Sequence, residues 1–110
     1  MGISTHVLDT TRGRPAAGVA VTLEQADGGG WRELSRATTD GDGRVKALLD
    51  VIPAAGHYRI AFEVGAWFQK TQTPSFYPRV VIEFETAPGQ SHYHVPLLLS
   101  PFGYTTYRGS

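Results

Sequence analysis

The stretch Arg79-Val80-Val81-Ile82-Glu83-Phe84-Glu85 is the clearest strand pattern in the chain, because β-branched and aromatic residues dominate it. The turn Ala87-Pro88-Gly89 follows, and residues 91–99 then form another largely apolar run. Short apolar runs separated by Gly and Pro are typical of consecutive strands in an all-β protein. Pro96 lacks a backbone N–H, so its place in the second run predicts an edge strand or a bulge there.

Short apolar runs separated by Gly and Pro continue over the rest of the chain, which contains 13 Gly and 7 Pro. Residues 65–71 are expected to hold one short helix. Counting every such run gives about eight expected strands, which predicts an all-β sandwich of two packed sheets. The remaining strands are expected at residues 3–9, 19–24, 31–38, 44–46, 57–64 and 104–108.

Length and composition limit the class of protein. A chain of 110 residues is enough for one domain with one core, which we expect to span residues 1–110. Lys plus Arg and Asp plus Glu number 10 each, and this balance argues against a nucleic-acid or membrane-surface partner. The absence of cysteine excludes disulfides and thiolate catalysis. Without a long apolar run or a signal-like start, a cytoplasmic protein is expected.

Histidines are the first candidates for chemistry. His92 and His94 lie two positions apart, so both point to the same face if this segment is a strand. His6 lies on another expected strand, beside apolar neighbours. A single histidine is more often a surface or structural residue, and this is our interpretation of His57. Three histidines also fit a catalytic zinc site with an open water position, although the sequence does not show that His6 approaches the other two.

Arg44 and the end of the chain are the other candidates. Arg44 follows the turn Asp40-Gly41-Asp42-Gly43, where an arginine is usually solvated. Inside a cleft, its forked donors would instead suit a planar, oxygen-rich anion. Residues 104–110 form an aromatic, cationic and small-residue end, whereas most chain ends are polar and frayed. Such an end can pack into a site.

Several segments resemble those of one family, the transthyretin-related proteins. The last four residues, Tyr107-Arg108-Gly109-Ser110, match the C-terminal tetrapeptide that marks the hydrolase branch of this family. Together the segments cover essentially the whole chain. The others are Ser4-Thr5-His6-Val7-Leu8-Asp9 with Gly13-Arg14-Pro15-Ala16, Asp42-Gly43-Arg44, Phe76-Tyr77-Pro78-Arg79-Val80, and His92-Tyr93-His94-Val95-Pro96-Leu97-Leu98-Leu99-Ser100-Pro101-Phe102-Gly103-Tyr104.

The resemblance implies a fold, an assembly and an activity. The fold is a transthyretin-like, two-sheet sandwich of eight strands with one short helix. The assembly is a homotetramer, a dimer of dimers, with an active site shared between subunits at each end of a central channel. The hydrolase branch converts 5-hydroxyisourate to 2-oxo-4-hydroxy-4-carboxy-5-ureidoimidazoline in urate degradation, without metal or cofactor. Transthyretin itself carries thyroid hormone but lacks the tetrapeptide and the histidines, so hormone carriage is disfavoured here.

The resemblance also assigns roles to individual residues. The catalytic histidines of the family fall on His6 and on His94 rather than His92, its arginine falls on Arg44, and its final serine falls on Ser110. We expect His6 and His94 to share water activation and proton transfer, while His6 and Arg44 also contact the substrate. The substrate-binding residues expected from the tail are Tyr107, Arg108 and Gly109, with the hydroxyl of Ser110 beside the reacting atoms.

Two other functions remain open from the sequence. One is a zinc hydrolase in which His6, His92 and His94 hold the metal, which stoichiometric zinc and loss of turnover on chelation would favour. The other is a non-catalytic, transthyretin-like module that binds small aromatic molecules. The tetrapeptide and the His-x-His strand are the sequence features that argue against the binding module.

Overall fold

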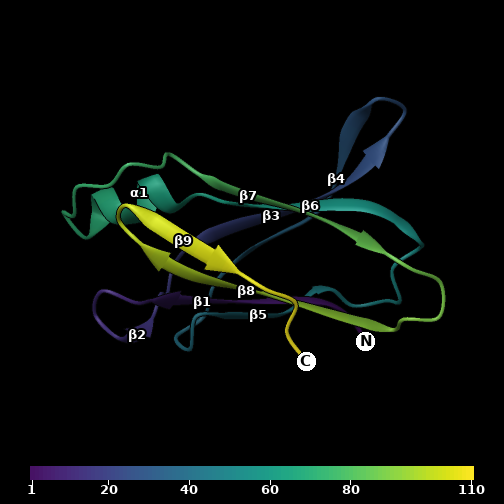
Figure 1. Ribbon diagram of the computed structural model, residues 1–110, viewed down its shortest axis with the longest axis horizontal. Coiled ribbons are helices and arrows are strands. Elements are labelled where there is room, and N and C mark those ends of the chain that lie inside the picture. The colour runs from purple at the N-terminus through teal and green to yellow at the C-terminus, as the bar shows by residue number, and fades with distance from the viewer.

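Two β-sheets face each other in the computed structural model, which describes residues 1–110 (Figure 1). The result confirms the expected two-sheet, nearly all-β architecture with one short helix. The first sheet contains β1 (Gly2–Asp9), β2 (Arg14–Pro15), β5 (Arg44–Leu49), β8 (His92–Ser100) and β9 (Gly103–Thr106). The second contains β3 (Ala20–Asp27), β4 (Gly30–Thr38), β6 (Gly56–Phe62) and β7 (Val80–Thr86).

The core lies between the two sheets and follows from alternation along the strands. On β6, Tyr58, Ile60 and Phe62 are at most 2% exposed, and Val21 and Leu23 of the neighbouring β3 are equally buried. Residues at every second position of a strand point to one face, so each sheet contributes one apolar face. These two faces form most of a single cluster of 20 buried residues.

The strand β1 has a central place in the first sheet. It pairs in parallel with β8 over its whole length and antiparallel with β5 and β2. Ile3, Thr5 and Val7 are fully buried, and the Thr5 hydroxyl donates to the carbonyl of Val95 over 2.6 Å. By alternation, Ser4 and His6 point to the outer face of the sheet.

The helix α1 (Val64–Lys70) lies at one end of the sandwich (Figure 1). It buries Val64, Trp67 and Phe68, and the indole N–H of Trp67 donates to the carbonyl of Ala17 over 2.8 Å. A helix of seven residues is marginal alone, so this packing stabilises it. No helix in the structure has the length and apolar character needed to cross a membrane.

The structure shifts several predicted strand ends. The strand expected at residues 57–64 ends at Phe62, because Val64 already begins α1 and continues the apolar pattern. The strand expected at 44–46 extends to Leu49 along β1. The strand expected at 104–108 ends at Thr106, which leaves Tyr107 and Arg108 outside the regular sheet.

The prediction of an edge or a bulge at Pro96 is wrong. Strand β8 lies between β1 and β9, and its register is unshifted on both sides. The β8–β9 ladder is instead interrupted at Pro96. Its last regular pair is Leu97 with Thr106, and the two chains pair again only at a single bridge between His94 and Gly109. Because proline cannot donate a ladder hydrogen bond, an interrupted ladder accommodates it inside the sheet.

Candidate active site

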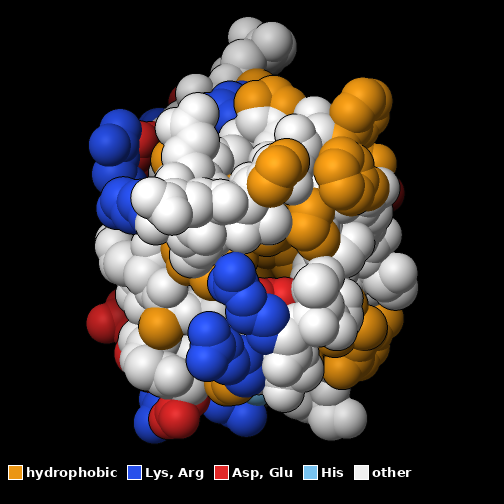
Figure 2. All heavy atoms as spheres, turned by 90° about the vertical axis from the view of Figure 1, so that its left-hand side faces the viewer, with side chains coloured by type: hydrophobic (Ala, Val, Ile, Leu, Met, Phe, Trp, Pro, Cys, Tyr) orange, Lys and Arg blue, Asp and Glu red, His pale blue; other side chains and the backbone are white.

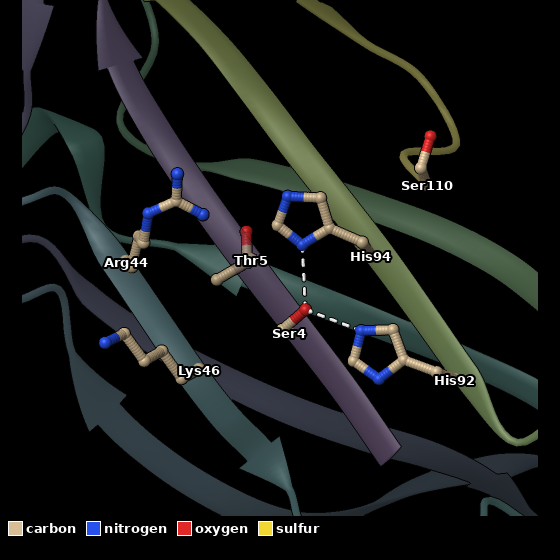
Figure 3. A pocket seen from close by; sticks show the side chains of 7 residues that line it. All are labelled: Ser4, Thr5, Arg44, Lys46, His92, His94 and Ser110. Atoms are coloured by element: carbon tan, nitrogen blue, oxygen red, sulfur yellow. Dashed lines mark hydrogen bonds between the residues drawn. The ribbon is translucent and has the colours of Figure 1, made fainter. Parts of the chain in front are cut away.

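A polar cavity of about 490 Å³ lies on the outer face of the first sheet (Figure 3). No hydrophobic residue and no Asp or Glu side chain lines it. Three strands and the C-terminal tail supply its walls, and it is broadly open to solvent. Its lining residues are Ser4, Thr5, Arg44, Lys46, His92, His94 and Ser110.

Strand register brings these side chains together. Ser4 of β1 lies directly opposite His94 of β8, and His6 of β1 lies opposite Arg44 of β5. Because side chains two positions apart share a face, Lys46 follows Arg44 on the same side of the sheet. Residues about 90 positions apart in the sequence therefore form one outward-facing row of polar groups.

The Ser4 hydroxyl bridges the two histidines of β8. Its Oγ lies 2.8 Å from Nδ1 of His94 and 3.1 Å from Nε2 of His92, as the dashed lines in Figure 3 show. The second ring nitrogen of His94 lies on the side of Arg44 in the same view. Ser4 itself is only 7% exposed, so solvent competes little for these hydrogen bonds.

His94 has an altered acid–base property. Partial burial lowers its pKa below the ordinary histidine value, and the charges of Arg44, His6 and His92 lower the pKa further. Contact with Ser4 opposes this shift without reversing it. The ring is therefore neutral near neutral pH, which is the state in which an imidazole can accept a proton from water.

The turn before β5 fixes the backbone at Arg44. The Asp40 carboxylate accepts hydrogen bonds of 2.9 Å from the backbone N–H groups of Asp42 and Arg44, which lower the pKa of Asp40. Gly43 has a φ of 75°, and a Cβ there would lie 2.4 Å from the carbonyl oxygen of Val7. Only glycine fits that position, because other residues would meet both backbone strain and a clash.

Arg44 and Lys46 give the cavity a positive character. Neither side chain has an Asp or Glu partner within 4.0 Å, although six other ion pairs are present in the molecule. Unpaired cations in a cavity without acidic side chains favour an anionic or oxygen-rich ligand. Arg44 lines this open cavity while remaining exposed to solvent, so both positions considered from the sequence apply to it.

His6 lies on the same face but outside the cavity lining. Its Nε2 is 2.8 Å from the carbonyl oxygen of Asp42, so the imidazole leans toward the turn before β5. Its charge nevertheless contributes to the lowered pKa of His94, so the two rings interact electrostatically. The structure thus brings His6 near the other predicted site residues, with one ring nitrogen occupied by the backbone.

The C-terminal tail packs directly against His94. The backbone N–H of Gly109 donates to the carbonyl of His94 over 2.8 Å, which places Ser110 at the cavity. A Cβ on Gly109 would lie 2.5 Å from Cδ2 of the His94 ring. The tail and the imidazole are therefore in close contact, and any side chain at residue 109 would displace one of them.

Tyr107 and Arg108 face a different cavity from the one that holds Ser110. They line a space of about 240 Å³ between β7 and β8, and His94 borders both cavities. The Arg108 guanidinium stacks over the ring of Tyr93 at 4.9 Å from its centroid, while Tyr107 is 55% exposed. Among the predicted tail residues, only Ser110 reaches the main cavity within one chain.

Sequence reasoning missed Ser4, Thr5 and Lys46 as lining residues. A signal for two of them was present, because Ser4 is two positions from His6 and Lys46 is two positions from Arg44. His57 pairs with Glu83 on the other sheet, in agreement with its interpretation as a surface or structural residue. No group of three or more His, Asp or Glu side chains is arranged to hold a metal ion.

Comparisons with known proteins agree with one another. The model of the HIUase/Transthyretin family matches residues 3–109. A 5-hydroxyisourate hydrolase of Salmonella typhimurium is 48% identical over 109 residues, covering 98% of this chain and 80% of the relative. The Klebsiella pneumoniae 5-hydroxyisourate hydrolase structure has a TM-score of 0.89 at 35% identity and covers both chains fully. Sea bream transthyretin in complex with thyroxine has a TM-score of 0.91 at 31% identity, covering 99% and 95%.

Proposed function

This chain belongs to the HIUase/Transthyretin family, and from that premise we propose that it hydrolyses 5-hydroxyisourate, as its similarly sized relatives are named to do. The product would be 2-oxo-4-hydroxy-4-carboxy-5-ureidoimidazoline, in urate degradation. The observation that carries the proposal is the convergence of His94, Arg44 and Ser110 on one polar cavity. A hormone carrier needs no such set of proton-transfer and anion-binding groups.

The proposed reaction is attack of water on a ring C–N bond, assisted by His6 and His94. One imidazole accepts a proton from the water as it attacks the ring carbon. The bond to the ring nitrogen then breaks, and a histidine N–H returns a proton to that nitrogen. The lowered pKa of His94 supports this role, since a neutral ring is available at physiological pH. No metal or cofactor is required by this scheme.

Arg44 is proposed to bind substrate oxygens and to stabilise the negative charge that develops during attack. Its guanidinium has no carboxylate partner within the chain, so its donors are available to a ligand. Preorganised donors at a developing oxyanion commonly supply about two to three orders of magnitude in rate. Ser110 would add a hydroxyl hydrogen bond to the substrate ring or to the attacking water.

Gly109 is proposed to position the tail against His94. Tyr107 and Arg108 are proposed to hold substrate or the channel wall in the assembled enzyme, which fits their place on the adjoining cavity. This division assigns Ser110 to the reacting atoms, Gly109 to the placement of the tail, and Tyr107 and Arg108 to the substrate or the channel wall.

We also propose that the enzyme is a homotetramer, a dimer of dimers. One end of the molecule carries an aromatic patch formed by Phe76, Phe102 and Tyr104, which are 71%, 69% and 41% exposed. Figure 2 shows apolar side chains gathered on this end. Apolar surface of this kind is commonly covered by another protein. Light scattering should give four chain masses, and a monomer that is fully active would contradict the shared site.

A direct assay tests the function. Purified protein is mixed with freshly generated 5-hydroxyisourate, and its absorbance decay is compared with the spontaneous rate, with and without a chelator. Acceleration that survives chelation supports the metal-free hydrolase. If the purified protein contains stoichiometric zinc and the chelator abolishes its activity, the zinc hydrolase is favoured. Ligand binding without any acceleration would favour a carrier.

A further inference from the structure

The contact between Ser4 and two histidines has a specific consequence for proton placement. One hydroxyl oxygen lies within hydrogen-bond distance of Nδ1 of His94 and Nε2 of His92. A serine hydroxyl carries a single proton, so it donates to only one of the two rings and must accept from the other. The protonation states of the two histidines are therefore linked, although the rings do not contact each other through a hydrogen bond.

Only two neutral arrangements satisfy both contacts. In the first, Nε2–H of His92 donates to Ser4 and Ser4 donates to Nδ1 of His94, so the proton of His94 is on Nε2. In the second, Nδ1–H of His94 donates to Ser4 and Ser4 donates to Nε2 of His92. Nε2 of His94 then carries a free lone pair on the side of Arg44 (Figure 3).

We propose that Ser4 and His92 form a proton relay that sets the tautomer of His94 and exchanges its proton with solvent. When Nε2 of His94 gives its proton to the leaving nitrogen, Nδ1 takes the Ser4 proton and Ser4 takes the proton from Nε2 of His92. Water then protonates Nδ1 of His92, which is part-exposed. One proton enters and one leaves, which leaves Nε2 of His94 as a base, and the reverse sequence restores the proton on Nε2. The inference rests on the proposed function, in which His94 transfers protons.

The charges around His94 favour this exchange among neutral rings. The cations that face it are Arg44 on β5 and, when protonated, His6 on β1 and His92 on its own strand, while Lys46 lines the same cavity. No acidic side chain lines the cavity to stabilise an imidazolium. Ser4 is almost fully buried, so water does not readily replace it in the relay. In this arrangement Ser4 and His92 are positioning residues, and His94 is the catalytic residue.

Nitrogen-15 NMR of the histidine rings tests the relay without any turnover. In His92→Ala, Ser4 has no second ring to which it can donate, so we expect His94 to shift toward the tautomer protonated on Nε2. In Ser4→Ala, His94 should adopt the tautomer mixture of free histidine. His57→Ala is the matched control, because His57 lies on the other sheet beside Glu83. An unchanged His94 tautomer in both folded variants would refute the relay, whether or not the protein is a hydrolase.

Kinetics provide the second test. We expect Ser4→Ala and His92→Ala each to lower kcat about tenfold, since one neutral hydrogen bond in the relay is lost, and to shift the pH profile of kcat. The double variant should be no slower than Ser4→Ala alone, because the relay is already broken. Effects of the two substitutions that multiply, or pH profiles that stay unchanged, would overturn the proposal.

Discussion

Substitution of Gly109 by alanine tests the placement of the catalytic imidazole. The added Cβ would lie 2.5 Å from Cδ2, 3.1 Å from Cγ and 3.3 Å from Cβ of His94, whereas ordinary contacts begin near 3.4 Å. The shortfall is 3.4 − 2.5 = 0.9 Å, so either the ring or the tail must move by roughly that distance. A misplacement of about 1 Å costs on the order of a hundredfold in rate, or about 2.7 kcal/mol of transition-state stabilisation.

The same substitution should leave the fold intact. Beyond β9, one backbone hydrogen bond joins the tail to the sheet, from the N–H of Gly109 to the carbonyl of His94. Loss of one such bond lowers the free energy of unfolding by only about 1 kcal/mol. We therefore expect a large drop in kcat/KM for 5-hydroxyisourate with a nearly unchanged thermal midpoint.

Gly30→Ala is the matched control for this experiment. Gly30 begins β4 in the opposite sheet, has no positive φ, and would place its Cβ 3.8 Å from the nearest heavy atom. It should keep wild-type activity. The reasoning is refuted if Gly109→Ala retains wild-type kcat/KM while folded. If Gly109→Ala instead unfolds the protein, the tail is primarily structural.

Four further predictions concern the same site. Replacing Arg44 with Gln should lower kcat/KM by about 10²–10³-fold in steady-state assays, because an oxyanion donor is lost; unchanged kinetics would remove Arg44 from the mechanism. The same variant should raise the pKa of His94 in an NMR titration, since a nearby cation that lowers it is gone, and a fall would contradict the assigned cause. The folded pKa of His94 lies below its ordinary value of 6.5, so the unfolded chain binds the proton first as pH falls. The free energy of unfolding of the wild type should therefore decrease, relative to that of His94→Asn, as pH falls below about 6.5. Urea titrations of both proteins across this pH range measure the difference. Deleting residues 107–110 should abolish turnover while circular dichroism still reports a folded sandwich, and a fully active truncated chain would contradict the role of the tail.

The fold was largely predictable because its signals are local. Alternation of apolar residues and the Gly and Pro turns between them identified the main strands. The errors occurred where tertiary contacts decide. Val64 continues the apolar pattern of β6 but starts α1, because Val64, Trp67 and Phe68 pack together into the core. Pro96 can lie inside the sheet because the β8–β9 ladder is interrupted at this residue.

The site was less accessible to sequence reasoning alone. Family resemblance selected His6, Arg44, His94 and Ser110, but pattern analysis gave no reason for their convergence. That convergence depends on parallel pairing between β1 and β8, which are separated by most of the chain. Such long-range pairing leaves no local trace in the sequence.

The tail shows the same limit of local patterns. Its composition suggested a packed end, but not that Gly109 would contact the His94 ring while Tyr107 and Arg108 face a second cavity. These directions follow from the pause in the β8–β9 ladder, after which the chain returns to β8 for one bridge. A pairing of this kind is set by the whole sheet.

Register is the physical quantity on which the whole site depends. Ser4 opposite His94 and His6 opposite Arg44 fix three strands relative to one another. A slip of β1 by one residue would turn Ser4 and His6 into the core and expose Ile3 and Val7, both fully buried now. Exposing two such side chains costs roughly 3–6 kcal/mol, a large part of the stability of a small domain. The apolar face of β1 therefore holds the polar groups of its other face in alignment, so the site is positioned by the same packing that forms the core.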